Sequence, residues 1–140
     1  MLHLTKLAVG VRDIEHLRAL QAERAVRNPP LRHRTRSFPR RANEVLDGGS
    51  MYWVIGGSLL ARQRIIDIIE DLRDDGSACT GLVLHPDLVP LAGRPTKPFQ
   101  GWRYLLAADA PPDLARAPMV KGEAALPATL RHELRALCLL

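Results

Sequence analysis

The chain has 140 residues, 46% of them hydrophobic and 25% charged, which is the composition of one globular domain that buries its own core. Its 20 basic and 15 acidic residues give a formal net charge of +5, a balance that favours anionic partners such as nucleic acid. No segment reaches the roughly 20 apolar residues that a membrane span requires, and residues 1–11 lack the features of a secretory signal. We therefore expect a single domain over residues 1–140, cytoplasmic and without a membrane partner.

The two cysteines, Cys79 and Cys138, lie far apart, and neither belongs to a CxxC pair. This spacing argues against a structural zinc site and against a disulfide framework. The glycine-rich segment GGSMYWVIGG (48–57) has neither the GxGxxG nor the P-loop pattern of a nucleotide-binding loop. The sequence thus predicts no metal and no cofactor.

The first half of the chain predicts one strand and two helices. Apolar and polar residues nearly alternate over 2–11, as in a strand with one buried face. Asp13 is a good N-cap for an amphipathic helix that ends before Pro29. Pro39 is placed to open a short second helix that buries Val45 and Leu46.

The second half predicts mainly strands. Residues 50–55 are aromatic and β-branched between two glycine pairs, a strong strand pattern. Residues 59–72 fit either a helical stripe or a strand, and we favour a strand that forms a hairpin with 78–84. Proline-rich connections follow over 86–98, and 101–105 predicts another strand.

The end of the chain predicts a mobile linker over 115–126 and an amphipathic helix after Pro127. Strands that adjoin through hairpins rather than helical crossovers favour an α+β fold. We expect a mainly antiparallel, barrel-like sheet with flanking helices. The terminal helix also suggests a possible homodimer.

The best candidate site is the run LRHRTRSFPRR (31–41), which contains no acidic residue. In an extended conformation, alternate arginines share one face and can neutralise several phosphates, and His33 adds a hydrogen-bond donor. The alternative is a solvated strand edge that discourages association of sheets.

Both tryptophans and one of the two tyrosines lie close to glycines, which suggests a stacking pocket for a base. Tyr52 and Trp53 point to opposite faces of a strand, so at least one of them belongs to the core. We expect Trp53 to be at least partly structural and Trp102 to face the ligand. Gln100 and Arg103 beside Trp102 can read hydrogen-bonding edges, or they can belong to a simple turn before a strand.

A catalytic site has less support. His33 or Glu44 as base, with Ser50 or a water as nucleophile, would suit a small hydrolase acting on a modified nucleoside. No GxSxG elbow accompanies them. Gln63 and Arg64, with Arg62 beside them, interrupt the apolar segment 59–72, and such residues more often face solvent than form a site.

Four segments carry a family resemblance: LHLTKLAVGV, HRTRSFPRRANEVLDGGSMYWVIGG, PFQGWRYL and DAPPDL. On these segments the chain resembles an uncharacterised alphaproteobacterial family, a domain of unknown function. The order of a short helix, a Gly-Gly turn, an aromatic strand and a hairpin is similar to PUA-like domains. That second resemblance implies a small β-barrel that binds RNA or modified nucleotides, as the ASCH and EVE groups usually do, and it is an analogy of fold alone.

We therefore expect a PUA-like module that binds RNA or a nucleotide through an arginine-rich, aromatic-lined pocket. A small hydrolase and a protein-interaction domain are the alternatives. The expected ligand-binding residues are His33, Arg34, Arg36, Arg41, Ser50, Trp53, Gln63, Gln100, Trp102 and Arg103.

Overall fold

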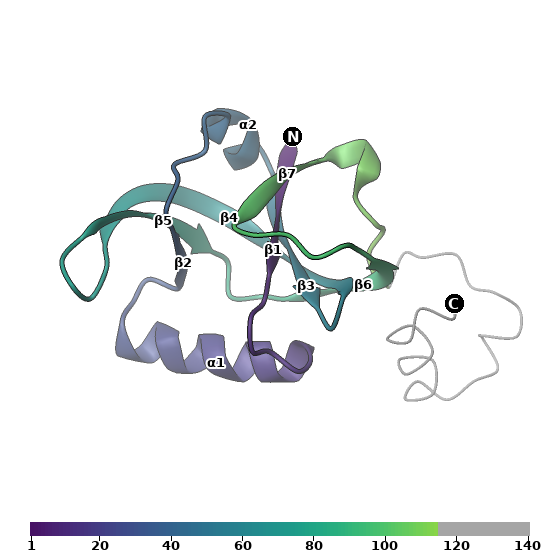
Figure 1. The fold of residues 1–140 in the computed structure, drawn as a ribbon, viewed down its shortest axis with the longest axis horizontal. Coiled ribbons are helices and arrows are strands. Elements are labelled where there is room, and N and C mark those ends of the chain that lie inside the picture. The colour runs from purple at the N-terminus through teal and green to yellow at the C-terminus, as the bar shows by residue number, and fades with distance from the viewer. Residues whose placement is uncertain (115–140) are drawn as a thin grey trace, which may run out of the picture.

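The computed structural model describes residues 1–114 and shows, within them, a mixed sheet of seven strands with two α-helices (Figure 1). The elements follow in the chain as β1 (Leu2–Leu7), α1 (Ile14–Arg27), β2 (Arg32–Thr35), α2 (Ala42–Leu46), β3 (Ser50–Ile55), β4 (Ser58–Leu72), β5 (Ala78–Leu84), β6 (Val89–Pro95), β7 (Trp102–Leu106) and the 3-10 turn η1 (Ala107–Asp109). The fold is α+β, as expected. The predicted linker over 115–126 and the predicted terminal helix lie outside the described residues.

The sheet is open rather than closed. Its strand order is β2-β5-β4-β3-β1-β7, with β6 paired to β4 beside this path. Most pairs are antiparallel, but β1 and β3 are parallel, because the chain passes through α1, β2 and α2 before it returns beside β1. β2 and β7 form the two ends of the order, and the expected barrel is therefore corrected to an open mixed sheet within residues 1–114.

The ambiguous segment 59–72 is a strand, which confirms the hairpin with β5. β4 is long enough to pair first with β3 and β6 and then with β5. The strand β6 was missed, because its two prolines argue against a strand. Proline is tolerated there because β6 pairs with β4 alone among the strands described.

The helix α1 begins where the N-cap predicts, since the carboxylate of Asp13 accepts a hydrogen bond from His16 N at 2.7 Å. Its buried side chains are Leu17 and Gln21, so the buried stripe includes an amide. In Figure 1 this helix runs across one end of the sheet, beneath β2 and β1. No helix in residues 1–114 combines the length and the apolar character needed to cross a membrane.

The helix α2 differs from its prediction. It begins at Ala42, three residues after Pro39, so the proline precedes the helix instead of opening it. Val45 is fully buried, whereas Leu46 is exposed on the other side of this single turn. The first strand is also shorter than expected, since β1 ends at Leu7.

Both faces of β3 are buried, because alternate side chains enter two separate apolar clusters. Met51, Trp53 and Ile55 belong to the larger cluster, which α1 and α2 also pack against. Tyr52 and Val54 belong to the smaller one. This confirms that Tyr52 and Trp53 point in opposite directions, and β3 thereby separates two sides of the molecule.

Gly49, between α2 and β3, lies where two backbone segments meet. A Cβ atom at this position would stand 2.2 Å from the carbonyl oxygen of Leu2 and 2.3 Å from that of Val45. Only glycine permits so close an approach of backbone to backbone. The N–H of Gly49 donates to the Val45 carbonyl at 2.8 Å, which fixes the entry into β3.

Candidate functional site

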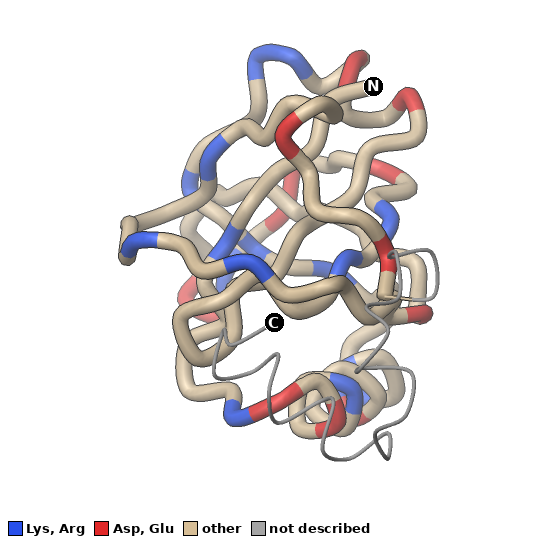
Figure 2. The backbone as a smooth tube through the Cα atoms, turned by 90° about the vertical axis from the view of Figure 1, so that its right-hand side faces the viewer, with Lys and Arg blue, Asp and Glu red and all other residues tan. Residues whose placement is uncertain are grey.

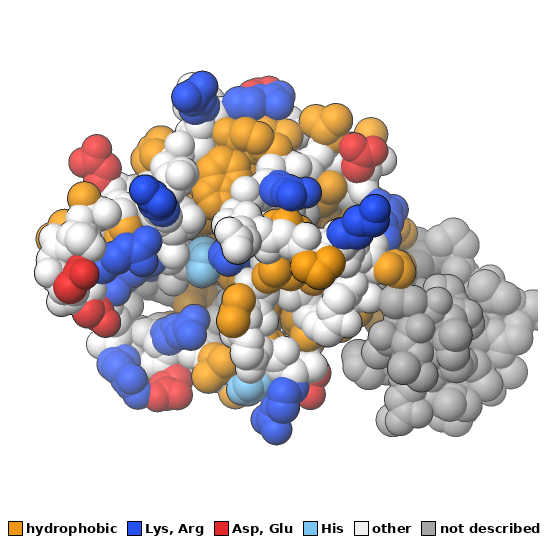
Figure 3. All heavy atoms as spheres, viewed as in Figure 1, with side chains coloured by type: hydrophobic (Ala, Val, Ile, Leu, Met, Phe, Trp, Pro, Cys, Tyr) orange, Lys and Arg blue, Asp and Glu red, His pale blue; other side chains and the backbone are white. Residues whose placement is uncertain are grey.

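Basic residues occur on several elements (Figure 2), but on one face they surround a hollow (Figure 3). This hollow lies between α1, β1, β2 and β3 and is here called the α1–β2 cleft. Its inner part has a volume of about 150 Å³ and its outer part about 340 Å³. Arg24, Leu31, Arg32 and His33 line both parts, so the two are continuous.

The inner part rests on a buried amide network. Gln63 of β4 is fully buried, and its oxygen accepts hydrogen bonds from Trp53 Nε1 at 3.1 Å and from Gln21 Nε2 at 2.8 Å. Its nitrogen donates to the Gln21 oxygen and to the carbonyl of His85, each at 2.7 Å. Every hydrogen-bonding position of this amide is therefore used. Gln63 holds the Trp53 indole in place and has no free group to offer a ligand.

His33 of β2 stands edge-on to the Trp53 ring, with centroids 5.4 Å apart and planes at 89°. Its Nε2 atom is buried and has no hydrogen-bond partner among residues 1–114, which is uncommon for a buried polar atom. Burial, and then the positive charges of Lys6 and Arg24, lower the pKa of His33 from 6.5 to about 4. The imidazole is thus neutral at neutral pH.

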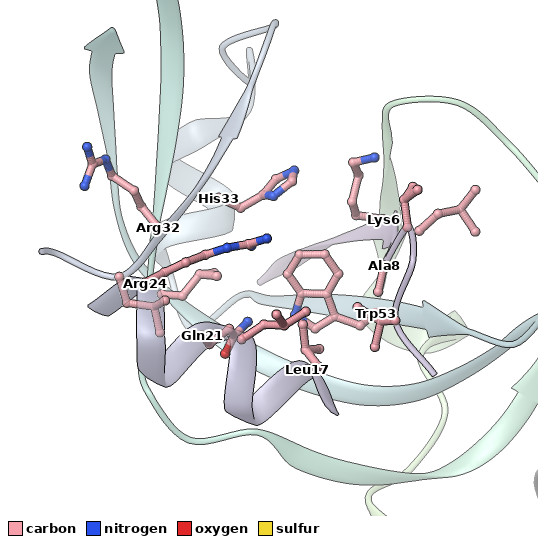
Figure 4. A pocket seen from close by; sticks show the side chains of 14 residues that line it. Lys6, Ala8, Leu17, Gln21, Arg24, Arg32, His33 and Trp53 are labelled. Atoms are coloured by element: carbon pink, nitrogen blue, oxygen red, sulfur yellow. The ribbon is translucent and has the colours of Figure 1, made fainter. Parts of the chain in front are cut away.

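Lys6 of β1 and Arg24 of α1 extend toward the same space as His33, above the indole of Trp53 (Figure 4). Neither has an ion-pair partner in the part of the chain that the structure describes. Two cations and an imidazole with an unused nitrogen therefore converge on one cavity. Such a site attracts an anion and offers it charge-assisted hydrogen bonds.

Two arginines of the basic run are already paired, although the run itself contains no acid. Arg32 bonds to Asp71, and Arg34 bonds to Asp71 at 3.3 Å and to Asp74 at 2.9 Å. The acids come from the distant end of β4 and the turn after it, a pairing that the local sequence does not reveal. The pKa of Asp71 falls to about 2, chiefly through the hydrogen bond from Arg32.

Three other predicted residues lie around a shallow depression of about 550 Å³ beside β7: Arg36, Gln100 and Trp102. Trp102 is half-buried, packs edge-on to Tyr104 and donates to the carbonyl of Ser37 at 3.3 Å. The structure thus brings His33, Trp53 and Gln63 together but places Arg36, Gln100 and Trp102 at a different surface.

The remaining predicted cations lie apart from the α1–β2 cleft. Arg41 pairs with Glu44, and its guanidinium stands 5.7 Å from the Tyr104 ring centre. The guanidinium of Arg103 stands 5.0 Å from the ring centre of Phe99. Both side chains are exposed, and each is held against an aromatic ring.

The residues of the hydrolase alternative occupy three separate places. Ser50 is buried on the side of β3 opposite to Trp53, where its N–H donates to His3 Nδ1 at 2.9 Å. Glu44 is exposed on α2, and His33 lies in the α1–β2 cleft. The structure forms no hydrogen bond between any two of these three candidates within residues 1–114.

Sequence reasoning missed Lys6, Gln21 and Arg24. A signal for Lys6 was present, because it continues the even-numbered positions of β1 whose side chains Leu2 and Leu4 are core. In α1, Gln21 and Arg24 follow Leu17 at the spacing of one helix face. Polar residues at positions that continue the buried face of β1 or α1 are therefore the sequence signal for this cavity.

A comparison with curated proteins and one with solved structures gave no match. Among protein families, one described as a protein of unknown function, DUF1489, matches residues 4–140. The match includes the whole α1–β2 cleft and nearly all of the chain. The chain therefore belongs to the DUF1489 family.

Proposed function

We propose that this protein binds a nucleotide or single-stranded RNA, with a phosphate group in the α1–β2 cleft. One observation carries the proposal: Lys6 and Arg24, neither ion-paired within residues 1–114, face a buried and unpartnered His33 nitrogen across one cavity. Like charges that face one cavity repel each other, and an anion bound between them relieves this repulsion. A phosphate supplies that compensation and accepts hydrogen bonds from all three groups.

The tryptophan floor of the cleft favours a ligand that also carries an aromatic ring. Trp53 is held by Gln63, so its indole is already in place before a ligand arrives. The ring is 4% exposed, so it offers a base an apolar contact at the bottom of the cleft. Arg27 and Arg34 also line the outer part, but Arg27 pairs with Glu23 and Arg34 pairs with Asp71 and Asp74, so the phosphate is assigned to Lys6 and Arg24. A phosphate joined to a base therefore suits the cleft better than a free inorganic anion.

Fold analogy supports the same class of ligand. The resemblance to PUA-like domains would make the open sheet a variant of an RNA-binding barrel, with the ligand beside the aromatic strand β3. Fold alone does not assign function, so the proposal depends on the residues of the cleft.

Calorimetric titration with adenosine 5′-monophosphate and with adenosine tests the phosphate requirement. We expect the monophosphate to bind and adenosine to bind at least about tenfold more weakly, since charged hydrogen bonds contribute about 1.5–3 kcal/mol. Arg24→Gln removes one cation of the cleft. Arg18→Gln is the matched control, because Arg18 lies on the same helix but pairs with Glu15 outside the cleft.

A short oligouridylate, followed by fluorescence anisotropy at several salt concentrations, tests RNA binding. Its affinity is expected to fall with salt, and Arg24→Gln should reduce the slope by about one unit. The proposal fails if monophosphate and nucleoside bind alike, or if Arg18→Gln weakens binding as much as Arg24→Gln does.

A further inference from the structure

A second polar cluster lies on the other side of β3, away from the α1–β2 cleft. It lines a depression of about 490 Å³ and contains His3 of β1, Ser50 and Tyr52 of β3, Arg62 of β4 and Asp113. His3, Ser50 and Tyr52 are each more than nine-tenths buried. Buried polar groups are costly unless they are satisfied, so their gathering at one depression calls for an explanation.

His3 can act only as a hydrogen-bond donor toward the depression. Its Nδ1 accepts the N–H of Ser50 at 2.9 Å, so the proton of the neutral ring must be on Nε2. Nε2 has no hydrogen-bond partner among the described residues and, unlike Nε2 of His33, is not sealed from solvent, so it opens to the depression. Burial and the charge of Arg62 lower the pKa of His3, which keeps the ring neutral. An Nε2–H of this kind cannot ligate a metal ion, but it can bind an acceptor oxygen.

Tyr52 supplies a second donor beside the first. Its ring packs edge-on to His3, with centroids 4.8 Å apart and planes at 61°. Its hydroxyl makes no hydrogen bond within residues 1–114, and although the ring is buried, the hydroxyl oxygen opens to the depression. Burial raises the pKa of Tyr52, so the hydroxyl keeps its proton.

The charges around these donors limit the ligand. Arg62 binds Asp113 through two hydrogen bonds of 2.6 and 2.8 Å and approaches the Ser50 hydroxyl at 3.4 Å. This ion pair is nearly neutral as a unit, and the exposed Arg64 adds one positive charge at the rim. A ligand with a single negative charge matches that balance. A dianion would leave one negative charge uncompensated by Arg64.

We propose that this depression is a second binding site, specific for the carboxylate group of a small molecule. One carboxylate oxygen accepts the Nε2–H of His3 and the other accepts the hydroxyl of Tyr52, while Arg64 balances the charge. The site is independent of the nucleotide proposal, because its residues lie on the opposite side of β3 and none of them lines the α1–β2 cleft.

The test is an NMR titration of the full chain with sodium acetate and, separately, with sodium phosphate at constant ionic strength. Acetate should shift the resonances of the Ser50 amide and the His3 ring with millimolar affinity. Phosphate should leave them unchanged. Tyr52→Phe keeps the ring packing and removes the hydroxyl, so it should weaken acetate binding roughly threefold to tenfold, the effect of one neutral hydrogen bond.

The control is Tyr104→Phe, which changes the other tyrosine of the chain, outside this depression. It should leave acetate affinity unchanged. If acetate shifts neither resonance, or if both variants bind it as the wild type does, the carboxylate site is refuted. Stronger shifts with phosphate than with acetate would also refute it.

Discussion

Gln21 and Gln63 join their side-chain amides in a reciprocal pair, with hydrogen bonds of 2.8 and 2.7 Å in opposite directions. The pair connects α1 to the middle of β4, and both residues are buried. It also fixes the indole of Trp53, which donates to the same Gln63 oxygen. The floor of the α1–β2 cleft and the docking of α1 thus depend on one amide.

Gln63→Leu should destabilise the protein strongly. The leucine fills a similar volume but leaves Trp53 Nε1, the His85 carbonyl and the Gln21 amide without a buried partner. Each unsatisfied group costs about 1–3 kcal/mol, so we expect the free energy of unfolding to fall by at least about 2 kcal/mol. Urea denaturation measures the change. Gln100→Leu alters an exposed amide and should have almost no effect; equal losses would contradict the network.

The two tryptophans should differ on substitution. Trp53 is 4% exposed and hydrogen-bonded, so Trp53→Ala should cost about 3–5 kcal/mol of stability. Trp102 is half-buried near the edge of the sheet, and its replacement by alanine should cost clearly less. Thermal melting of both variants gives the comparison. A larger loss for Trp102 would show that β7, rather than the cleft floor, dominates the packing.

The stability of the fold should depend on His33 below neutral pH. The pKa of His33 is about 4 in the folded chain and 6.5 when unperturbed, so the unfolded state takes up its proton first. The contribution of the neutral His33 ring to the free energy of unfolding is present above pH 6.5 and is lost as the pH falls toward 4. In the His33→Asn variant, stability should therefore change less with pH between pH 6.5 and 4. The midpoints of urea denaturation measure this change. An unchanged profile would contradict the buried neutral state.

Protonation of His33 should have the opposite effect on the affinity for RNA, which should rise as the pH falls. A phosphate beside His33 favours the charged imidazole and raises its pKa, so binding takes up a proton. Phosphodiesters keep their charge throughout, and oligouridylate binding should therefore tighten as the pH falls from 7 toward 5. His33→Asn should remove this dependence in fluorescence anisotropy, whereas Arg18→Gln should retain it.

The contribution of Asp71 to stability should change with pH in the same direction as that of His33, but in a more acidic range. The pKa of Asp71 is lowered from 3.8 to about 2, mainly by Arg32, so its contribution is present above pH 3.8 and is lost as the pH falls toward 2. Asp71→Asn should cost about 1–2 kcal/mol at neutral pH, and this cost should shrink at acid pH. Asp74→Asn, at a largely exposed carboxylate, is the control for urea denaturation and should cost less.

Local signals in the sequence were sufficient for most elements of this fold. The Asp13 cap, the aromatic strand β3 and the turn after β4 each depend on neighbours in the chain, and each was predicted correctly. The parallel pairing of β1 with β3 and the open edges depend on contacts between distant segments. Composition and periodicity do not encode such contacts, and the barrel prediction failed for that reason.

The candidate site was harder to predict than the elements. His33 and Trp53, two of the expected ligand-binding residues, line one cavity, but Lys6 and Arg24 of the same cavity come from two other elements. Arg34 looked free in the sequence because its acidic partners lie 37 and 40 residues away. Charge runs show which residues are basic, and only the folded chain shows which charges remain unpaired.

The crowded junction at Gly49 restricts how this protein family can diverge. A glycine codon is one base from an alanine codon, so mutation offers alanine at this position readily. Its methyl group would overlap the backbone oxygens of Leu2 and Val45, and the chain would have to open the contact between β1 and α2 to admit it. Relatives that retain this crossing must therefore inherit glycine here, whatever ligand their clefts come to accept.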